Sequence, residues 1–304
     1  MKKNHLMRLV IVVAVIFVFS GGKGFSQMAG MHDHQQMDHS RHMQMTQPRE
    51  IIVDLETVPA ELKTGSPSKI TFMIKDGEGE PVKDLVITHD RLVHVIIASA
   101  DFSVFAHIHP DDFSPITDEM KKKAEYPVVF TFPKAGQYII AIDSAVKDML
   151  ISEHFTLDVG GGSQMGVYKK DLSREKKFGD LTVTLSTTPD ELVAGKEALL
   201  KYIFKKGSGP VTDLEPYLSA PMHVAIISPD LNNFMHVHGE LPGASMGHDH
   251  MGQMMHMMHM EVPKKFGPEI DVPAIFPAKG LYQIFSEVKH DGKVVVISFM
   301  VEVK

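Results

Sequence analysis

The stretch HVIIASADFSVFAHIH, residues 94–109, recurs in outline as HVAIISPDLNNFMHVH at residues 223–238. Each stretch consists of two short runs of β-branched and aromatic residues, joined by a segment rich in Asp, Ser, Asn or Pro. Such runs favour strands, and the polar segment between them favours a turn. Each stretch therefore predicts a β-hairpin, and its recurrence predicts that the chain contains one structural unit twice.

The repeat extends beyond the hairpin in both directions. ELKTGSPSKITFMIKDGEGEPVKDL (61–85) matches ELVAGKEALLKYIFKKGSGPVTDL (191–214), and FPKAGQY (132–138) matches FPAKGLY (276–282). A helical pattern is found only at TDEMKKKAEY (117–126). Many short strands in about 110 residues are typical of an immunoglobulin-like or cupredoxin-like sandwich, which often keeps a tyrosine at the start of a late strand. We predict an all-β chain of two tandem sandwiches that arose by internal duplication.

The chain begins with the features of an export signal. Lys2, Lys3 and Arg8 precede an apolar stretch from Leu9 to Phe19, which is followed by small residues. Eleven apolar residues are short for the roughly 20 that span a bilayer, so we expect no stable membrane span after cleavage. We predict a signal peptide at 1–26, a disordered Met- and His-rich segment at 27–48, a first sandwich at 49–160, a linker at 161–178, and a second sandwich at 179–304 with a Met- and His-rich insertion at 243–260.

The composition excludes several classes of site and partner. The chain of 304 residues contains no cysteine, which rules out disulfides, thiolate zinc sites and blue-copper centres. Its formal net charge is −7, and removal of Lys2, Lys3 and Arg8 with the signal makes it more negative. This charge argues against nucleic acid and anionic lipid surfaces as partners.

Histidines recur at the same spacing in both copies. Twelve residues separate His94 from His107, so a turn centred on Ala100–Asp101 would place the two directly opposite each other; the second copy would turn at Pro229–Asp230. His109 points to the same face as His107 because side chains alternate along a strand. Each copy thus predicts imidazoles that converge from two strands, as a three-histidine metal site requires. The predicted ligands are His94, His107 and His109 in the first copy, and His223, His236 and His238 in the second.

A core position is the alternative interpretation of these histidines. Their face also carries Ile96 and Phe105 in the first copy, and Ala225 and Phe234 in the second, and so resembles the core side of a sheet. Backbone carbonyls can satisfy one buried histidine. Three neutral imidazoles that pack together without a carboxylate in the hairpin leave lone pairs unsatisfied, however, and we therefore favour a metal site.

Other residues near the hairpins receive a simpler interpretation. Met222 and Met235 occur in the second copy alone, and we interpret them as packing residues, with axial thioether ligation as the alternative. His89, His154 and His290 have no histidine counterpart in the other copy, and we treat them as ordinary surface or strand residues.

Two low-complexity segments combine methionine with histidine: MAGMHDHQQMDHSRHMQM (28–45) and GASMGHDHMGQMMHMMHM (243–260). Neither has a pattern that buries a core, so both should be disordered without metal. Thioethers select Cu(I) and Ag(I), and imidazole also admits Cu(II) and zinc. We predict copper, with zinc or silver as alternatives. An adhesive Met-rich surface is the non-metal alternative, which the interleaved His and Asp disfavour. The candidate ligands are Met31, His32, His34, His39, His42, Met246, His248, His250, Met254, Met255, His256, Met258 and His259.

At HVAIISPDLNNFMHVH and FPAKGLYQIFSEVKHDGKVVVISFMVEV the second copy resembles the secreted YtkA-like β-sandwich domains, which are immunoglobulin-like modules often encountered beside copper-efflux functions. The Met/His segments are similar in kind to those of CopC-type periplasmic copper-resistance proteins. The resemblance covers most of 179–304 and, more weakly, 51–160. It implies an envelope protein that handles copper by binding rather than turnover. CopC-type sites are built partly from the mature N-terminus, and no ligand is carried over from them.

The leading functional hypothesis is a periplasmic or secreted copper-binding protein, not an enzyme, which sequesters copper or passes it to an envelope copper-efflux or copper-assembly partner. One alternative is a copper oxidoreductase with an open position at a three-histidine copper. The other is a sandwich that serves as an interaction module and binds metal incidentally. The sequence indicates no catalytic residue.

Overall fold

The computed structural model describes residues 49–147, 149–161, 166–243 and 262–304, which belong to one compact unit. The predicted signal peptide, the N-terminal Met/His segment and residues 244–260 of the insertion lie outside the described residues. The described chain is almost entirely β, and it contains the same sandwich twice, as the repeat predicts. We call residues 49–161 the first copy and residues 176–304 the second copy.

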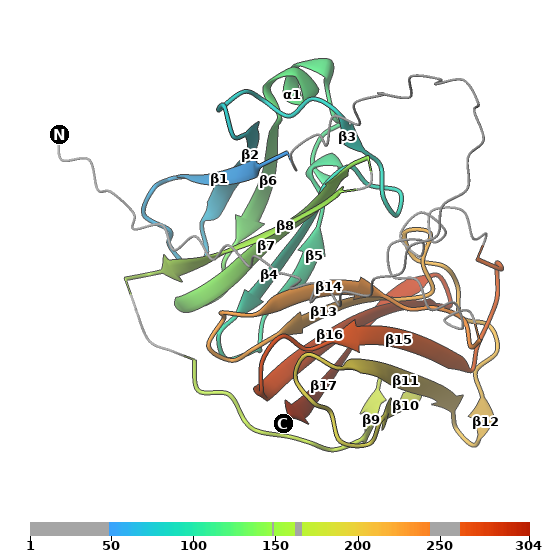
Figure 1. The fold of residues 1–304 in the computed structure, drawn as a ribbon. Coiled ribbons are helices and arrows are strands. Elements are labelled where there is room, and N and C mark those ends of the chain that lie inside the picture. The colour runs from blue at the N-terminus through green and yellow to red at the C-terminus, as the bar shows by residue number, and fades with distance from the viewer. Residues whose placement is uncertain (1–48, 148, 162–165, 244–261) are drawn as a thin grey trace, which may run out of the picture. The chain divides into compact units, whose positions relative to one another are not determined.

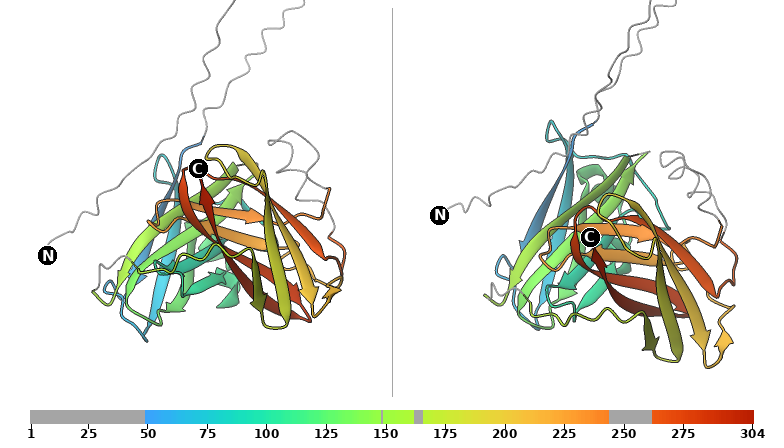
Figure 2. Two further views of the ribbon diagram at one scale, coloured as in Figure 1. Left: turned by 90° about the horizontal axis from the view of Figure 1, so that it is seen from below. Right: turned by 60° about the horizontal axis from the view of Figure 1, so that its bottom comes forward.

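Each copy is built from two antiparallel sheets (Figures 1 and 2). In the first copy, one sheet has the order β1-β2-β6, and the other joins β5, β4, β7 and β8, with β3 at the end of β7. A short 3-10 helix and helix α1 connect β5 to β6. The elements are β1 (Ile51–Val58), β2 (Pro67–Asp76), β3 (Leu85–Val86), β4 (His94–Ser99), β5 (Phe105–Ile108), η1 (Pro110–Asp112), α1 (Asp118–Lys123), β6 (Glu125–Thr131), β7 (Gly136–Val146) and β8 (Met149–Val159).

The second copy repeats this pairing. Strands β10, β11 and β15 correspond to β1, β2 and β6, and the sheet β14-β13-β16-β17 corresponds to β5-β4-β7-β8. The long strands β16 and β17 run side by side in Figures 1 and 2. The elements are β9 (Glu175–Phe178), β10 (Leu181–Thr188), β11 (Glu197–Lys206), β12 (Gly209–Pro210), β13 (His223–Ile227), β14 (Phe234–His238), β15 (Glu269–Ile275), β16 (Gly280–His290) and β17 (Lys293–Val303).

A tyrosine at the same place in each copy supports the immunoglobulin-like assignment. The hydroxyl of Tyr138 donates to the carbonyl of Lys134 at 3.0 Å, and that of Tyr282 donates to the carbonyl of Ala278 at 2.9 Å. Such a bond, from a late strand back to the preceding corner, is a hallmark of immunoglobulin-like sandwiches. The two FPxxGxY elements supply these tyrosines, and the modest helical pattern at 117–126 forms α1.

The predicted linker is too long. Its last residues, Glu175–Phe178, form β9, which pairs with β10 at the edge of the second copy. These residues belong to the second sandwich because the ring of Phe178 packs on its core. The ring centroids of Phe178 and Phe299 are 5.9 Å apart.

The hairpin register also differs from the prediction. His107 pairs with Ile96, and in the second copy His223 pairs with His238. The first histidine of each hairpin therefore lies opposite the third, not the second. The turn lies one residue later than predicted, with Phe102 in the left-handed region at φ 62°. Since this changes the pairing by two residues, every side chain keeps its face.

The central strands β4 and β13 are buried on both faces. In β4, Val95 and Ile97 point into the core of the first sandwich. Ile96 and Ala98 alternate with them and belong to separate apolar clusters that contain residues of both copies. The histidines share the face of Ile96, so this face is buried against the other copy and is not the core side of its own sandwich, as the alternative interpretation had it. We call it the histidine face of each sheet.

Candidate metal centre

The histidine faces of the two copies pack against each other. One apolar cluster joins Ile96 and Ala141 of the first copy to Ala225 of the second. The ring of Phe105 stacks on the ring of Phe285, with centroids 4.4 Å apart and an interplanar angle of 15°. This contact buries apolar area, a favourable term in folding and association, and it brings the histidines of the two hairpins together.

In the first copy the three predicted histidines meet at His107. Its Nε2 lies 3.1 Å from Nδ1 of His94 and 3.2 Å from Nε2 of His109. His94 and His109 are neighbours across the hairpin, with ring centroids 5.0 Å apart. All three side chains are buried.

In the second copy the equivalent histidines also meet. Nδ1 of His223 lies 3.4 Å from Nε2 of His236. The ring of His238 lies 4.6 Å from that of His223 and 4.8 Å from that of His236, between centroids.

The two sets form one cluster and not the two separate sites that the sequence predicted. The ring centroid of His107 lies 5.3 Å from that of His223 and 5.2 Å from that of His236. One ring nitrogen each from His94, His107 and His223 lie within 4.8 Å of one another, and all three residues are buried. This group, which we call group 1, takes its ligand atoms from both copies.

Carboxylates reach the cluster reciprocally from the opposite copy. Nδ1 of His107 lies 2.6 Å from Oε2 of Glu287, and Nδ1 of His236 lies 2.7 Å from Oδ2 of Asp143. Asp143 and Glu287 occupy equivalent positions, because each pairs with the first histidine of its own hairpin. The hairpins contain no carboxylate partner, as the sequence indicated, and the packing of the copies supplies one.

The remaining outer nitrogens of the first copy are also engaged. Nε2 of His94 lies 3.0 Å from the carbonyl of Thr88, and Nδ1 of His109 lies 2.9 Å from Oδ2 of Asp112. A carbonyl accepts only, so His94 donates from Nε2 and keeps a lone pair on Nδ1. Metal-binding histidines commonly hold their second nitrogen in this way, with an N–H donated to a carboxylate or carbonyl.

The inner nitrogens have the spacing that a metal ion requires. A metal–nitrogen bond of about 2.0–2.1 Å in tetrahedral geometry separates two ligand nitrogens by about 3.3 Å. The separations around His107 Nε2 are 3.1 and 3.2 Å. A single proton on His107 Nε2 can be shared with its neighbours, whereas a cation satisfies all the converging lone pairs together.

Burial keeps these imidazoles neutral. It lowers the pKa of His94 to about 2, and it lowers the pKa values of His107, His223 and His238 well below their ordinary value. Burial also raises the pKa of Glu287 to about 8. The neutral imidazole is the form that binds metal, so these four histidines are in the protonation state that ligands require.

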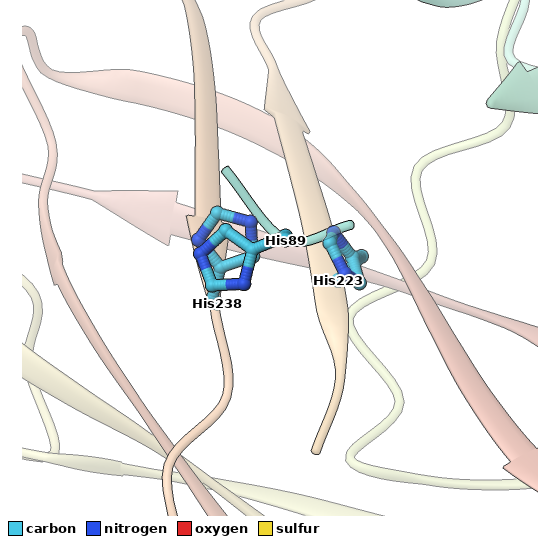
Figure 3. Close-up of side chains that lie close together, drawn as sticks. All are labelled: His89, His223 and His238. Atoms are coloured by element: carbon cyan, nitrogen blue, oxygen red, sulfur yellow. The ribbon is translucent and has the colours of Figure 1, made fainter. Parts of the chain in front are cut away.

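His89 belongs to the cluster, so its interpretation as an ordinary surface or strand residue is wrong. Its ring stacks on that of His238 with centroids 3.7 Å apart, and it lies 5.4 Å from the ring of His223 (Figure 3). One nitrogen each from these three residues form a second set within 4.8 Å of one another, which we call group 2. His89 contacts histidines of the other copy, so no local pattern reveals it. The histidine cluster hereafter means His89, His94, His107, His109, His223, His236 and His238.

The other residues set aside in the sequence lie apart from these rings. His154 contacts Phe234, with centroids 6.3 Å apart. His290 lies between Asp213 and Asp291, at 3.3 and 3.7 Å. Met222 is fully buried in the second sandwich core, and Met235 packs against the same core, which supports the packing interpretation. The candidate ligands in the two Met/His segments lie outside the described residues.

Comparison with solved structures finds distant likenesses. An Escherichia coli adhesin, FdeC, is 11% identical, with a TM-score of 0.23, over 83% of this chain and 64% of its own, so the chain spans less than two thirds of that protein. Domains 4 and 5 of the S-layer protein SbsC are 10% identical, with a TM-score of 0.21, over 84% of this chain and 98% of theirs. Invasin, a bacterial integrin-binding protein, is 12% identical, with a TM-score of 0.21, over 82% and 39%. These scores support no inference about function.

No helix in the described part of the chain is both long and apolar enough to cross a membrane.

A search of curated proteins found no match. A domain of unknown function (DUF8832) matches residues 49–161 and again residues 176–304. These two segments are the two sandwiches, and the chain belongs to the DUF8832 family, with one family domain in each copy.

Proposed function

We propose that this protein is an exported copper-binding protein whose firm site is the histidine cluster between the two sandwiches. The observation that carries the proposal is the convergence of His94, His107 and His109, which lies beside His223 of the other copy, together with the outer contacts of these three residues. Imidazole nitrogens converge at 3.1–3.2 Å around His107, while the outer nitrogens face Thr88, Asp112 and Glu287. A ligand set whose outer nitrogens are held by a carbonyl and carboxylates, and whose inner nitrogens converge on one point, is arranged as metal sites are.

The choice of copper rests on the donor set together with the composition of the chain. Imidazole suits both copper and zinc, so the cluster alone admits either. The segments 28–45 and 243–260 add thioethers, which favour Cu(I) and, by the same softness, Ag(I). Many weak ligands near one firm site raise the effective concentration of the ion there. We therefore assign capture to the Met/His segments and retention to the cluster.

Burial of the cluster favours retention over turnover. His94, His109 and His223 are 2%, 1% and 1% exposed. An oxidoreductase needs an open coordination position that substrate can reach, and an enclosed ligand set offers poor access. The export signal predicted at 1–26 would place such a protein in the periplasm or outside the cell. There it would sequester copper or pass it to an envelope copper-efflux or copper-assembly protein.

The test is a copper titration of the full mature chain against the double variant H94Q/H107Q. A large excess of glycine should compete for copper at the weaker Met/His ligands, so the copper that remains bound reports the firm site. We expect the wild-type protein to retain copper with nitrogen ligation by X-ray absorption, and the variant to lose it. The matched control H154Q replaces a histidine outside the cluster and should retain copper as the wild type does. Equal retention by H94Q/H107Q would refute the proposal.

A further inference from the structure

Resting on the proposed function, we propose that group 2, formed by His89, His223 and His238, binds a second copper ion. This ion is held by one histidine of the first copy and two of the second. It makes the cluster a two-copper centre that stabilises the contact between the sandwiches. The sequence predicted a second site within the second hairpin, formed by His223, His236 and His238. The geometry points instead to a site that needs both copies.

His238 provides a second observation, which does not depend on the nitrogen distances that define group 2. Its Nε2 is buried, and no described residue offers it a hydrogen-bond partner. A buried nitrogen without a partner carries a desolvation cost, and a role as a metal ligand is one physical reason for such an atom. In the first copy, the equivalent residue His109 contacts His107 through its inner nitrogen and Asp112 through its outer one.

The turn that carries His89 is held by contacts with both copies. The next residue, Asp90, accepts a hydrogen bond of 2.6 Å from Ser219 of the second copy. Arg91 then pairs with Asp111 at 3.3 Å, within the first copy. The backbone of His89 has φ 49°, in the left-handed region, which non-glycine residues adopt where surrounding contacts enforce it.

The second copy has no equivalent ligand to offer in return. Leu218 occupies the position of His89 in that copy, five residues before the first hairpin histidine, with a φ of 47°. Among the residues that the structure describes, group 2 therefore exists once, although the fold is repeated. This difference also provides a substitution, H89L, that installs a side chain which the same turn already carries in the other copy.

The histidine cluster contains enough ligands for two ions. His223 is the member that groups 1 and 2 share. If His223 serves group 2, His94 and His107 keep His109, whose Nε2 lies 3.2 Å from that of His107, for the first ion. His236 lies beside both sets, with its ring 5.2 Å from that of His107 and 4.8 Å from that of His238.

A second ion held in this way couples metal binding to the docking of the copies. Its ligands come from the turn before β4 on one side and from β13 and β14 on the other. An ion that binds only the docked arrangement stabilises that arrangement, and by linkage the docked arrangement raises the affinity for the ion.

The experiment uses the full mature chain loaded with Cu(II) in excess glycine, with two readouts. Elemental analysis counts the retained ions, and electron paramagnetic resonance detects magnetic coupling between neighbouring Cu(II) ions. We expect two retained ions and a coupled spectrum for the wild type, and one ion with an uncoupled spectrum for H89L. The control H154L should behave as the wild type. Thermal unfolding of the metal-free proteins shows whether H89L folds. If it does not, the milder variant H89Q takes its place in the experiment.

The outcomes separate this inference from the proposed function. If the wild type retains no copper against glycine, the proposed function itself fails. One ion in both the wild type and H89L overturns the second site and leaves the first intact. Two coupled ions in H89L would equally overturn the role of His89.

Discussion

His107 of the first copy and Glu287 of the second lie 2.6 Å apart, Nδ1 to Oε2, and both are buried. The reciprocal pair, His236 and Asp143, lies 2.7 Å apart. Each sandwich thus supplies the carboxylate that orients the middle histidine of the other. The centre belongs to the pair of copies, and neither copy contains it alone.

The first prediction concerns this carboxylate. Glu287→Gln keeps the size of the side chain but cannot ionise to the carboxylate that a metal-bound imidazole would stabilise. Loss of such an outer partner typically lowers metal affinity about 10–100-fold, and we expect a loss in that range with the same number of bound ions. Competition with a chromophoric chelator measures it. The control E302Q changes a partly exposed glutamate near the end of β17, and a comparable loss there would show that the effect is not specific to the centre.

The sequence predicted the fold well because the determinants of each sandwich are local and occur twice. The FPxxGxY elements specify the tyrosine corners, and the short β-branched runs become the strands. The hairpin register was wrong by two residues because Phe102 and Leu231 adopt left-handed backbone conformations that turn composition did not identify. The face of the histidines was unaffected, since a two-residue change preserves alternation.

The centre itself could be predicted only in part. The spacing in the hairpins gave the six predicted histidines, whereas His89, Asp143 and Glu287 contribute through contacts between the copies. One unused clue was the run HVIIAS at 94–99, which does not alternate polar with apolar residues. Such a strand is typically buried on both faces, so it implied that a second layer covers the histidine face.

A second prediction tests the apolar contact between the copies. Phe105→Ala removes the ring that stacks on Phe285 and should destabilise the protein. Phe105 is only partly buried, so we expect a cost below the about 3–5 kcal/mol of a fully buried phenylalanine. Urea denaturation measures this cost. The exposed Phe113, 46% accessible, is the matched control, and F113A should change stability by no more than about 0.5 kcal/mol. Equal effects of the two variants would contradict the packing described here.

A third prediction concerns the pH dependence of the metal-free protein. Burial lowers the pKa of His94 to about 2 and that of His89 to about 4, whereas an unfolded histidine titrates near 6.5. As the pH falls below about 6.5, the unfolded chain binds protons that the folded chain does not, so the free energy of unfolding decreases. Each such histidine adds a slope of at most about 1.4 kcal/mol per pH unit.

Glu287 acts in the opposite direction within part of this range. Burial raises its pKa to about 8, so the stability it contributes is present at low pH and is lost as the pH rises from about 4.5 towards 8. The histidines outnumber it, and we expect a net loss of stability from pH 6.5 to pH 4.5. Urea denaturation of chelator-treated protein between pH 6.5 and pH 4.5 measures the free energy of unfolding. In H89L this free energy should depend less steeply on pH. A stability that rises on acidification would mean that the rings are charged in the folded state.

The last prediction separates the docking of the copies from general stability. Phe105 donates no ligand, yet its contact with Phe285 holds the two histidine faces together, so F105A should weaken copper binding as well as the fold. F178A is the matched comparison, because Phe178 packs against Phe299 at the edge of the second sandwich, outside the contact between the copies. It should lower stability while copper affinity stays near that of the wild type. Chelator competition at a temperature where both variants remain folded makes the comparison. If the two variants lose affinity in proportion to their lost stability, copper reports only the folded fraction, and the centre does not depend on how the sandwiches meet.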